Sequence, residues 1–215
     1  MKTNEDLQKD VQDAIKWERL LNPAEIGVTA KDGVITLTGV VDSYAKKTEA
    51  EDAAKNVVGV RAVVEKIEIK FASDKIDDNE IANDIISTYK WNWAIPKDKI
   101  KVRVEEGWVT LEGDLNRNFQ KESAKDLIRN HEGVKGVTNN IKIVTETLDS
   151  IEKKDIERAL ARTWSLNDKD IHVKVAGNKV TLIGKIESLY QKNEAGRISW
   201  NAPGVTSVDN ELVVE

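Results

Sequence analysis

The chain is built from three copies of one sequence pattern. A run of alternating apolar residues closes on a glycine three times, and these glycines lie 74 and then 71 residues apart: Gly39, Gly113 and Gly184. A downstream Gly-Val pair keeps the same two offsets, beginning at Gly59, Gly133 and Gly204. Several motifs that share one pair of offsets define a tandem repeat. We place repeat 1 at residues 1–72, repeat 2 at residues 73–146 and repeat 3 at residues 147–215, so that the chain forms three small domains.

Each repeat is predicted to fold as α-β-β-α-β, an α+β unit in which two helices pack on one face of a three-stranded mixed sheet. In repeat 1 a helix is expected over residues 5–20, where apolar residues recur at helical spacing. Thr3 or Asn4 supplies its N-cap oxygen. Two strands of alternating polarity follow, joined by a tight turn at Asp32-Gly33, a dipeptide that tolerates positive φ.

A second helix and a last strand complete each repeat. The second helix carries an alanine on its core face in every copy: Ala50, Ala124 and Ala195. It is expected to stop at the glycine of the Gly-Val pair, because glycine enters the left-handed region without a Cβ clash. The glycines that close the second strand are explained by backbone geometry, and close approach of a ligand to the backbone is the alternative.

The inventory of reactive side chains argues against an enzyme. The chain has no Cys and two His, and it contains no motif of nucleophilic, metal-dependent or nucleotide-dependent catalysis. His131 is expected at a surface or edge, and His172 on the outward side of a strand. We therefore expect no catalytic residue, no metal site and no cofactor. A net charge of −5 without a basic repeat also predicts that the chain does not bind nucleic acid.

The first ten residues carry acidic and basic side chains in place of the apolar segment of a secretory signal. Taken as a native start, this predicts a cytoplasmic protein. If the chain is a trimmed mature form, a periplasmic location is expected instead.

Tryptophan is over-represented, with six Trp against three Tyr and two Phe. Trp17 and Trp91 hold equivalent positions near the end of the first helix, and Trp93 and Trp164 are equivalent two residues further on. This paired placement predicts packing where helix meets strand, in a core or between repeats. Trp108 differs, because the alternation of its strand points it outward beside a hairpin turn, where an indole must cover a neighbour, a partner or lipid headgroups.

If the chain has a binding surface, we expect it in repeat 2. The candidate partner- or lipid-binding residues are Trp91, Trp93, Trp108, Lys101 and Arg103. The two cations belong to the richest basic stretch, residues 97–103, and basic side chains close to an indole suit anionic lipid headgroups. A solvated strand face is the alternative reading of that stretch.

The combined pattern resembles the BON domain family, named for bacterial osmotically induced periplasmic and nodulation-specific proteins. The resemblance rests on the Thr-Leu-x-Gly strand motif, the helical stretch, the Gly-Val pair and a last strand of the form Val-x-Asn-x-Ile/Leu, and it covers nearly the whole chain in three copies. It implies a non-catalytic module that is proposed to bind phospholipid membranes and occurs in osmotic-stress proteins. Repeat 1 departs from the pattern, because Glu65 stands where Asn139 and Asn210 occur.

We therefore expect a non-catalytic binding protein of osmotic or envelope stress whose partner is a phospholipid surface. Several weak contacts on one chain would add through effective concentration. A protein–protein interaction or protein-protecting scaffold is the alternative from another class. A small ligand or K⁺ is a third, which no oxygen-rich loop of the sequence supports.

Overall fold

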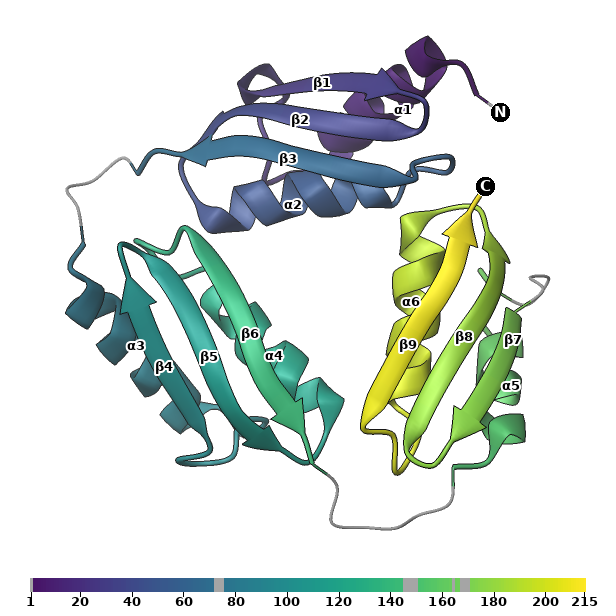
Figure 1. Cartoon of the computed structure of the whole chain (residues 1–215). Helices are drawn as coiled ribbons and strands as arrows, with labels where there is room; N and C mark the ends of the chain where they lie inside the picture. Colours follow the sequence, from purple (N-terminus) through teal and green to yellow (C-terminus); the bar gives the residue numbers. More distant parts are fainter. Residues whose placement is uncertain (1, 72–75, 145–150, 164, 167–170) are drawn as a thin grey trace. The chain divides into compact units, whose positions relative to one another are not determined.

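Each repeat folds into a three-stranded sheet with two helices on one face, so the predicted α+β class is confirmed (Figure 1). The structure is a computed structural model, and it describes residues 2–71, 76–144, 151–163, 165–166 and 171–215. The predicted boundaries between the repeats fall outside the described residues and stay predictions. Each repeat is described by itself.

The same order of elements recurs in the three repeats. Repeat 1 contains α1 (Asn4–Trp17), a short 3-10 helix (Pro23–Glu25), β1 (Ile26–Lys31), β2 (Val34–Val41), α2 (Tyr44–Lys55) and β3 (Ala62–Ile69). Repeat 2 contains α3 (Asp78–Trp91), β4 (Ile100–Glu105), β5 (Trp108–Leu115), α4 (Asn118–Ile128) and β6 (Gly136–Ile143). Repeat 3 contains α5 (Lys153–Ala161), β7 (Ile171–Ala176), β8 (Lys179–Ile186), α6 (Leu189–Trp200) and β9 (Ser207–Val214). Among the helices of the described residues, none has the length and apolar character that crossing a bilayer requires.

The helix starts agree with the sequence better than the helix ends do. Thr3 is the N-cap of α1, and its hydroxyl accepts a hydrogen bond from the Asp6 backbone N–H at 3.1 Å. The predicted end of this helix at residue 20 is wrong, because Glu18 already has an extended backbone. The second helices likewise end four or five residues before their predicted glycines, which lie instead in the turn to the last strand with φ of 95°, 84° and 82°: Gly59, Gly133 and Gly204.

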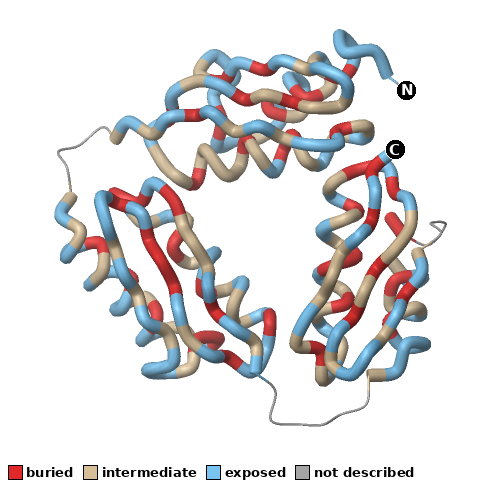
Figure 2. The backbone as a smooth tube through the Cα atoms, in the orientation of Figure 1, coloured by how far each residue is buried: buried red, intermediate tan, exposed pale blue. Residues whose placement is uncertain are grey.

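The middle strand of each sheet pairs with both others. In repeats 2 and 3 it runs antiparallel to the strand before it and parallel to the strand after it. Parallel neighbours need a crossover connection, and the second helix supplies it. The alanines predicted for its core face are fully buried, which lets the helix lie close to the sheet: Ala50, Ala124 and Ala195. Figure 2 shows the buried residues along these helix–sheet interfaces.

Two side chains tie the crossover helix to the last strand. In every repeat a helix lysine donates from Nζ to a strand carbonyl at 2.7–2.9 Å: Lys47 to Ile67, Lys121 to Ile141 and Lys192 to Leu212. In repeats 2 and 3 a strand asparagine donates from Nδ2 to the backbone oxygen of that lysine, Asn139 at 2.9 Å and Asn210 at 2.6 Å. In repeat 1 Glu65 stands at the position of these asparagines. Its side chain has no amide N–H, so it cannot donate the hydrogen bond that Asn139 and Asn210 make to the helix.

Gly113 shows why a glycine closes the second strand. Its φ is +149°, and a Cβ added to it would lie 2.1 Å from the carbonyl oxygen of Lys99. Backbone geometry therefore accounts for this glycine, as the sequence favoured.

We predict that Gly113→Ala destabilises repeat 2 by about 3 kcal/mol, because the methyl group meets a backbone oxygen that cannot move alone. Gly177→Ala is the matched control, since Gly177 also has positive φ (+58°) but a Cβ there meets nothing within 4 Å, and it should cost about 1 kcal/mol. Urea unfolding of the full chain, followed by circular dichroism, measures both. Equal costs would contradict the steric explanation.

Candidate functional site

Three tryptophans are exposed at the ends of first helices. Trp17 is 84% exposed, Trp91 83% and Trp93 89%, so the prediction that they pack into a core is wrong, and its alternative, packing between repeats, stays a prediction. The reason is helical phase: α3 buries Ile81, Ile85 and Tyr89, and Trp91 follows the last of these by two positions, which places it on the opposite face. Trp17 follows the buried Ile15 in the same way. Their predicted relative Trp164 lies outside the described residues.

In repeat 2, Trp91 and Trp93 lie at one end of the domain, which we call the tip. The tip consists of the last turn of α3, residues 92–99 and the first turn of α4. The Trp93 ring lies 6.4 Å from the ring of Phe119, which is 45% exposed. Lys97 and Lys99 are exposed on the same connection. The tip therefore combines bare aromatic rings with cations.

A small hollow adjoins the tip. It has a volume of ≈ 350 Å³ and lies between α3 and the connection that follows. Apolar and aromatic residues line it together with two lysines and one aspartate: Ile86, Tyr89, Ile95, Pro96, Ile100, Lys90, Lys97 and Asp98. The Tyr89 hydroxyl donates to the Ala124 carbonyl at 2.6 Å, and burial raises the pKa of this phenol. This bond holds the end of α3 against α4, so the hollow has a firm wall.

Trp108 points outward from β5, as predicted, and it covers the neighbouring strand. Its Nε1 donates to Thr138 Oγ1 at 2.8 Å. A Cβ built on Gly136, its partner in the parallel register, would lie 2.5, 2.6 and 2.8 Å from three consecutive carbons of the six-membered ring. Such similar distances place the ring flat over Gly136, with its other face turned to solvent and the side chain half exposed.

Trp108 does not join the other two candidate indoles. Asp78, at the start of α3, accepts hydrogen bonds from the backbone N–H groups of Glu106 (2.7 Å) and Gly107 (2.9 Å), so the hairpin beside Trp108 lies at the N-terminal end of α3. Trp91 ends that same helix of 14 residues, which spans about 20 Å. The structure therefore places Trp91 and Trp93 together and Trp108 apart from them.

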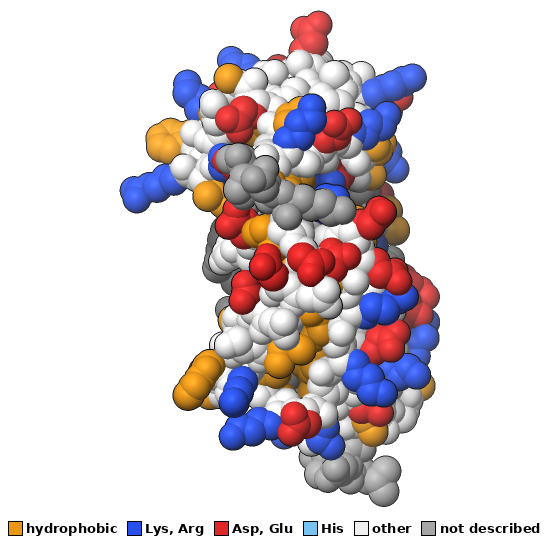
Figure 3. All heavy atoms as spheres, turned by 90° about the vertical axis from the view of Figure 1, so that its left-hand side faces the viewer, with side chains coloured by type: hydrophobic (Ala, Val, Ile, Leu, Met, Phe, Trp, Pro, Cys, Tyr) orange, Lys and Arg blue, Asp and Glu red, His pale blue; other side chains and the backbone are white. Residues whose placement is uncertain are grey.

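Lys101 and Arg103 lie on the exposed side of β4, and charges of both signs surround them. Arg103 pairs with Glu105 at 3.0 Å, and both side chains are about two-thirds exposed, so the pair contributes little free energy. Lys101 lines a shallow depression together with two lysines and three carboxylates: Lys99, Lys142, Asp98, Glu112 and Asp114. On the face that Figure 3 shows, hydrophobic side chains likewise lie among charges of both signs. Partner binding by Lys101 and Arg103 stays a prediction.

His131 is half-buried, and His172 is exposed on β7. The Nε2 atom of His131 lies 3.1 Å from Thr88 Oγ1, between α3 and the turn that follows α4. Burial lowers the pKa of His131, and the nearby carboxylate of Asp84 partly offsets this.

Sequence reasoning missed Phe119 and the hollow beside the tip. Phe119 carried a signal, because it is an aromatic residue in the first turn of a helix whose apolar face lies elsewhere. The hollow carried none, since it depends on how residues 95–98 fold back on α3.

The BON domain model matches residues 3–70, 77–145 and 149–215, which is nearly the whole chain. The chain is also similar to osmotically-inducible protein Y of Escherichia coli (strain K12), at 28% identity over 131 residues, or 57% of this chain and 63% of that protein. It thus spans less than two thirds of that relative's length.

Solved structures give weaker likenesses. A structure of CdsD, a structural protein of the type III secretion system of Chlamydia trachomatis, is 17% identical with a TM-score of 0.26, over 98% of this chain and 92% of that one. The PrgH periplasmic domain is 9% identical with a TM-score of 0.22, over 94% and 98%. At such scores neither carries weight for function.

We predict that Gly136→Ala displaces the Trp108 indole, because the new methyl group would lie within 3 Å of the ring. The Nε1–H resonance of Trp108 should then shift in the NMR spectrum and exchange faster with water. Thr138→Val is the comparison variant: it removes the acceptor and shifts the Nε1–H resonance by itself, but it leaves the ring over the glycine. The C–H resonances of the six-membered ring should therefore move in Gly136→Ala and stay in place in Thr138→Val. An unchanged resonance in the alanine variant would contradict the stacked geometry.

The lowered pKa of His131 also predicts that the stability of the fold depends on pH. Because burial lowers it, the unfolded chain binds this proton more readily than the folded chain does. The stability that the neutral imidazole provides is present in full above the unfolded pKa of about 6.5 and is lost as the pH falls below it. His131→Gln should therefore lose less stability than the wild type between pH 7.5 and pH 5 in urea unfolding, and an equal loss would refute the assignment.

Proposed function

The chain belongs to the BON domain family, and from that premise we propose that it is a non-catalytic binding protein of osmotic stress that attaches to a phospholipid surface through the tip of repeat 2. The observation that carries the proposal is the exposure of Trp91 (83%) and Trp93 (89%), two positions apart in the sequence, at one end of a domain. The similarity to an osmotically inducible protein supports the stress context.

The chemistry of the tip suits a headgroup layer better than bulk water. Indoles have an apolar body and one N–H donor, which places them at membrane–water interfaces. Trp91 and Trp93 offer two such rings and Phe119 adds a purely apolar one, and exposed rings of this size are costly unless something covers them. Lys97 and Lys99 each add about 1 kcal/mol of attraction to an anionic surface, which Asp98 partly cancels.

Repeat 1 offers a second contact of the same kind. Trp17 ends α1 at the position that Trp91 holds in α3, and it is 84% exposed. Lys16 precedes it in the chain, and Glu18 and Arg19 follow, so the carboxylate partly cancels the two cations. Two weak contacts on one chain bind more strongly than either alone when both reach the surface. Trp108 lies at the opposite end of α3 and is not part of this proposal. Lys101 lines a depression together with Asp98 and Lys99 of the tip, and a share of Lys101 and Arg103 in lipid binding is a separate proposal.

Vesicle sedimentation of the full chain tests the proposal. At low salt the wild type should sediment with vesicles that contain phosphatidylglycerol and much less with pure phosphatidylcholine. Trp91→Ala/Trp93→Ala should weaken binding about tenfold, equivalent to ~1.4 kcal/mol of lost apolar contact. Because both side chains are more than four-fifths exposed, the fold should be unaffected.

Trp108→Ala is the matched control, since it removes an indole from the same repeat about 20 Å away. It should retain vesicle binding. Failure of the wild type to bind anionic vesicles would remove the lipid surface as partner. A loss in Trp108→Ala as large as in the double variant would move the contact to the sheet.

A further inference from the structure

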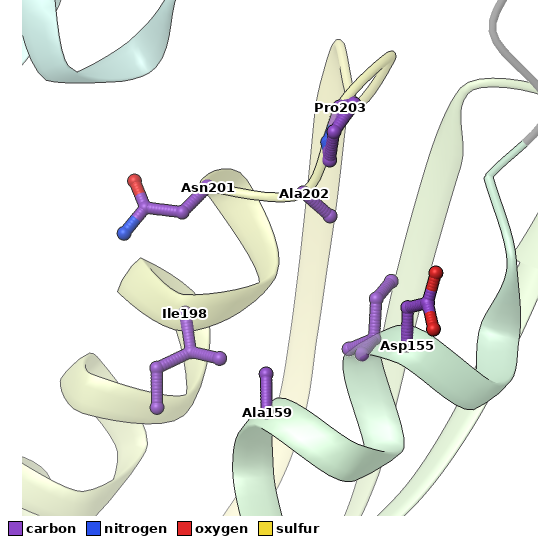
Figure 4. Close-up of a pocket in the computed structure, with 7 residues that line it drawn as sticks. Asp155, Ala159, Ile198, Asn201, Ala202 and Pro203 are labelled. Atoms are coloured by element: carbon purple, nitrogen blue, oxygen red, sulfur yellow. The ribbon is translucent and has the colours of Figure 1, made fainter.

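A groove lies between α5 and α6 of repeat 3. It has a volume of ≈ 360 Å³, and its walls are almost wholly apolar: Ile156, Ala159, Ile198, Ala202 and Pro203. Asp155 and Asn201 complete the lining. Figure 4 shows Ala159 and Ala202 pointing into the space between the two helices, while the Asn201 side chain turns away from it. The groove therefore has one charged group, the Asp155 carboxylate.

In repeat 2 the equivalent space, between α3 and the end of α4, is occupied by side chains of the domain itself. The offset of 71 residues sets Ala159 equivalent to Thr88, Ala202 to His131 and Asp155 to Asp84. In repeat 2 the imidazole of His131 lies against Thr88 at 3.1 Å. Of the three helix pairs in the chain, the pair of repeat 2 thus has an aromatic ring between its helices, and the pair of repeat 3 has two methyl groups in its place.

Replacing large side chains by small ones leaves space that neighbouring groups fill only in part. An enclosed apolar cavity takes up small ring-shaped molecules, because they restore the lost contacts without a need for hydrogen bonds. The groove of repeat 3 is open to solvent on one side, so a ring in it regains a part of these contacts. In repeat 2 the imidazole of His131 occupies this space, so the space accepts a planar ring between the first helix and the end of the second.

The lining also specifies the chemistry of the ring. Ala159 offers no hydroxyl where Thr88 contacts the imidazole, so the ring needs no polar atom at that edge. Asp155 lies at the edge of the groove, and its contact with Arg158 is long, at 3.4 Å, with both side chains about two-thirds exposed. Such a pair is weak, so the carboxylate is free to attract a second cation.

We propose that the groove of repeat 3 binds a small organic cation built on an aromatic ring, with the ring between Ala159 and Ala202 and the positive charge at Asp155. The site is independent of the tip of repeat 2 and does not rest on lipid binding. It assigns repeat 3 a ligand of a different class.

Benzylamine is the probe, because it joins one ring to one ammonium group, and benzyl alcohol is its neutral counterpart. The full chain, labelled at Ala and Ile methyl groups, is titrated at pH 7.5 and followed by NMR. Saturable shifts are expected at Ala159, Ala202 and Ile198, with a Kd on the order of millimolar, as fits a ligand of eight heavy atoms. Benzyl alcohol should bind roughly three- to fivefold more weakly, the value of one exposed ion pair.

Three variants decide the assignment. Asp155→Asn should weaken benzylamine binding to the level of benzyl alcohol and leave the alcohol unchanged. Ala159→Thr/Ala202→His copies the filled repeat and should abolish both. Thr88→Ala/His131→Ala copies the empty repeat and should create a second site whose shifts fall on α3 and α4.

The outcomes separate cleanly. Absence of saturable shifts in the wild type overturns the site, and so does undiminished binding when the groove is filled with Thr and His. Equal affinity for amine and alcohol overturns the cation and with it the proposed ligand class. If the repeat 2 variant does not fold, the arms in repeat 3 still give a decision, because they do not involve that domain.

Discussion

The parallel pairing of the second and third strands is the constraint on which each repeat depends. Parallel neighbours cannot be joined by a hairpin, so a helix must cross over the sheet between them. In repeat 2 that helix is α4, which is brought close by the buried Ala124 and tied to β6 through Lys121 and Asn139. Once it covers part of one face, α3 completes the layer on the same side. The other face and the helix ends are left for contacts outside the domain.

The same constraint explains what the sequence could predict. Three copies with shared offsets show the period, and alternation and helical spacing then give the order of elements. Burial of Ala50, Ala124 and Ala195 follows, because an alanine is what a close crossover helix needs on its core face. Gly113 follows as well, since a backbone oxygen occupies the place of its Cβ.

The candidate site was harder to predict, because it depends on phase and register. Trp91 belongs to the exposed face only because α3 ends there and the residue lies two positions after Tyr89. In repeat 1 the predicted helix runs to residue 20, three residues too far. Trp17 therefore does not stand out as the exposed last residue of the helix. The outward direction of Trp108 followed from alternation, but its contact with Gly136 needs the parallel register, which joins residues 28 positions apart. No local pattern contains that information.

The repeats keep the ties between helix and strand and change the groups around them. The lysine-to-carbonyl bond occurs in all three. Across the outer face, by contrast, Trp108 donates to Thr138 in repeat 2, whereas Lys179 pairs with Asp209 at the equivalent positions of repeat 3.

This difference follows from the energetics. Breaking one of these partly buried ties leaves a polar group unpaired at a cost of up to about 1–3 kcal/mol, which a domain of some 70 residues cannot spare. Exchanging one exposed pair for another costs little. A chain with three such domains can therefore present different chemistry at equivalent positions, a bare indole on one repeat and an open groove on another, while every copy keeps the same fold.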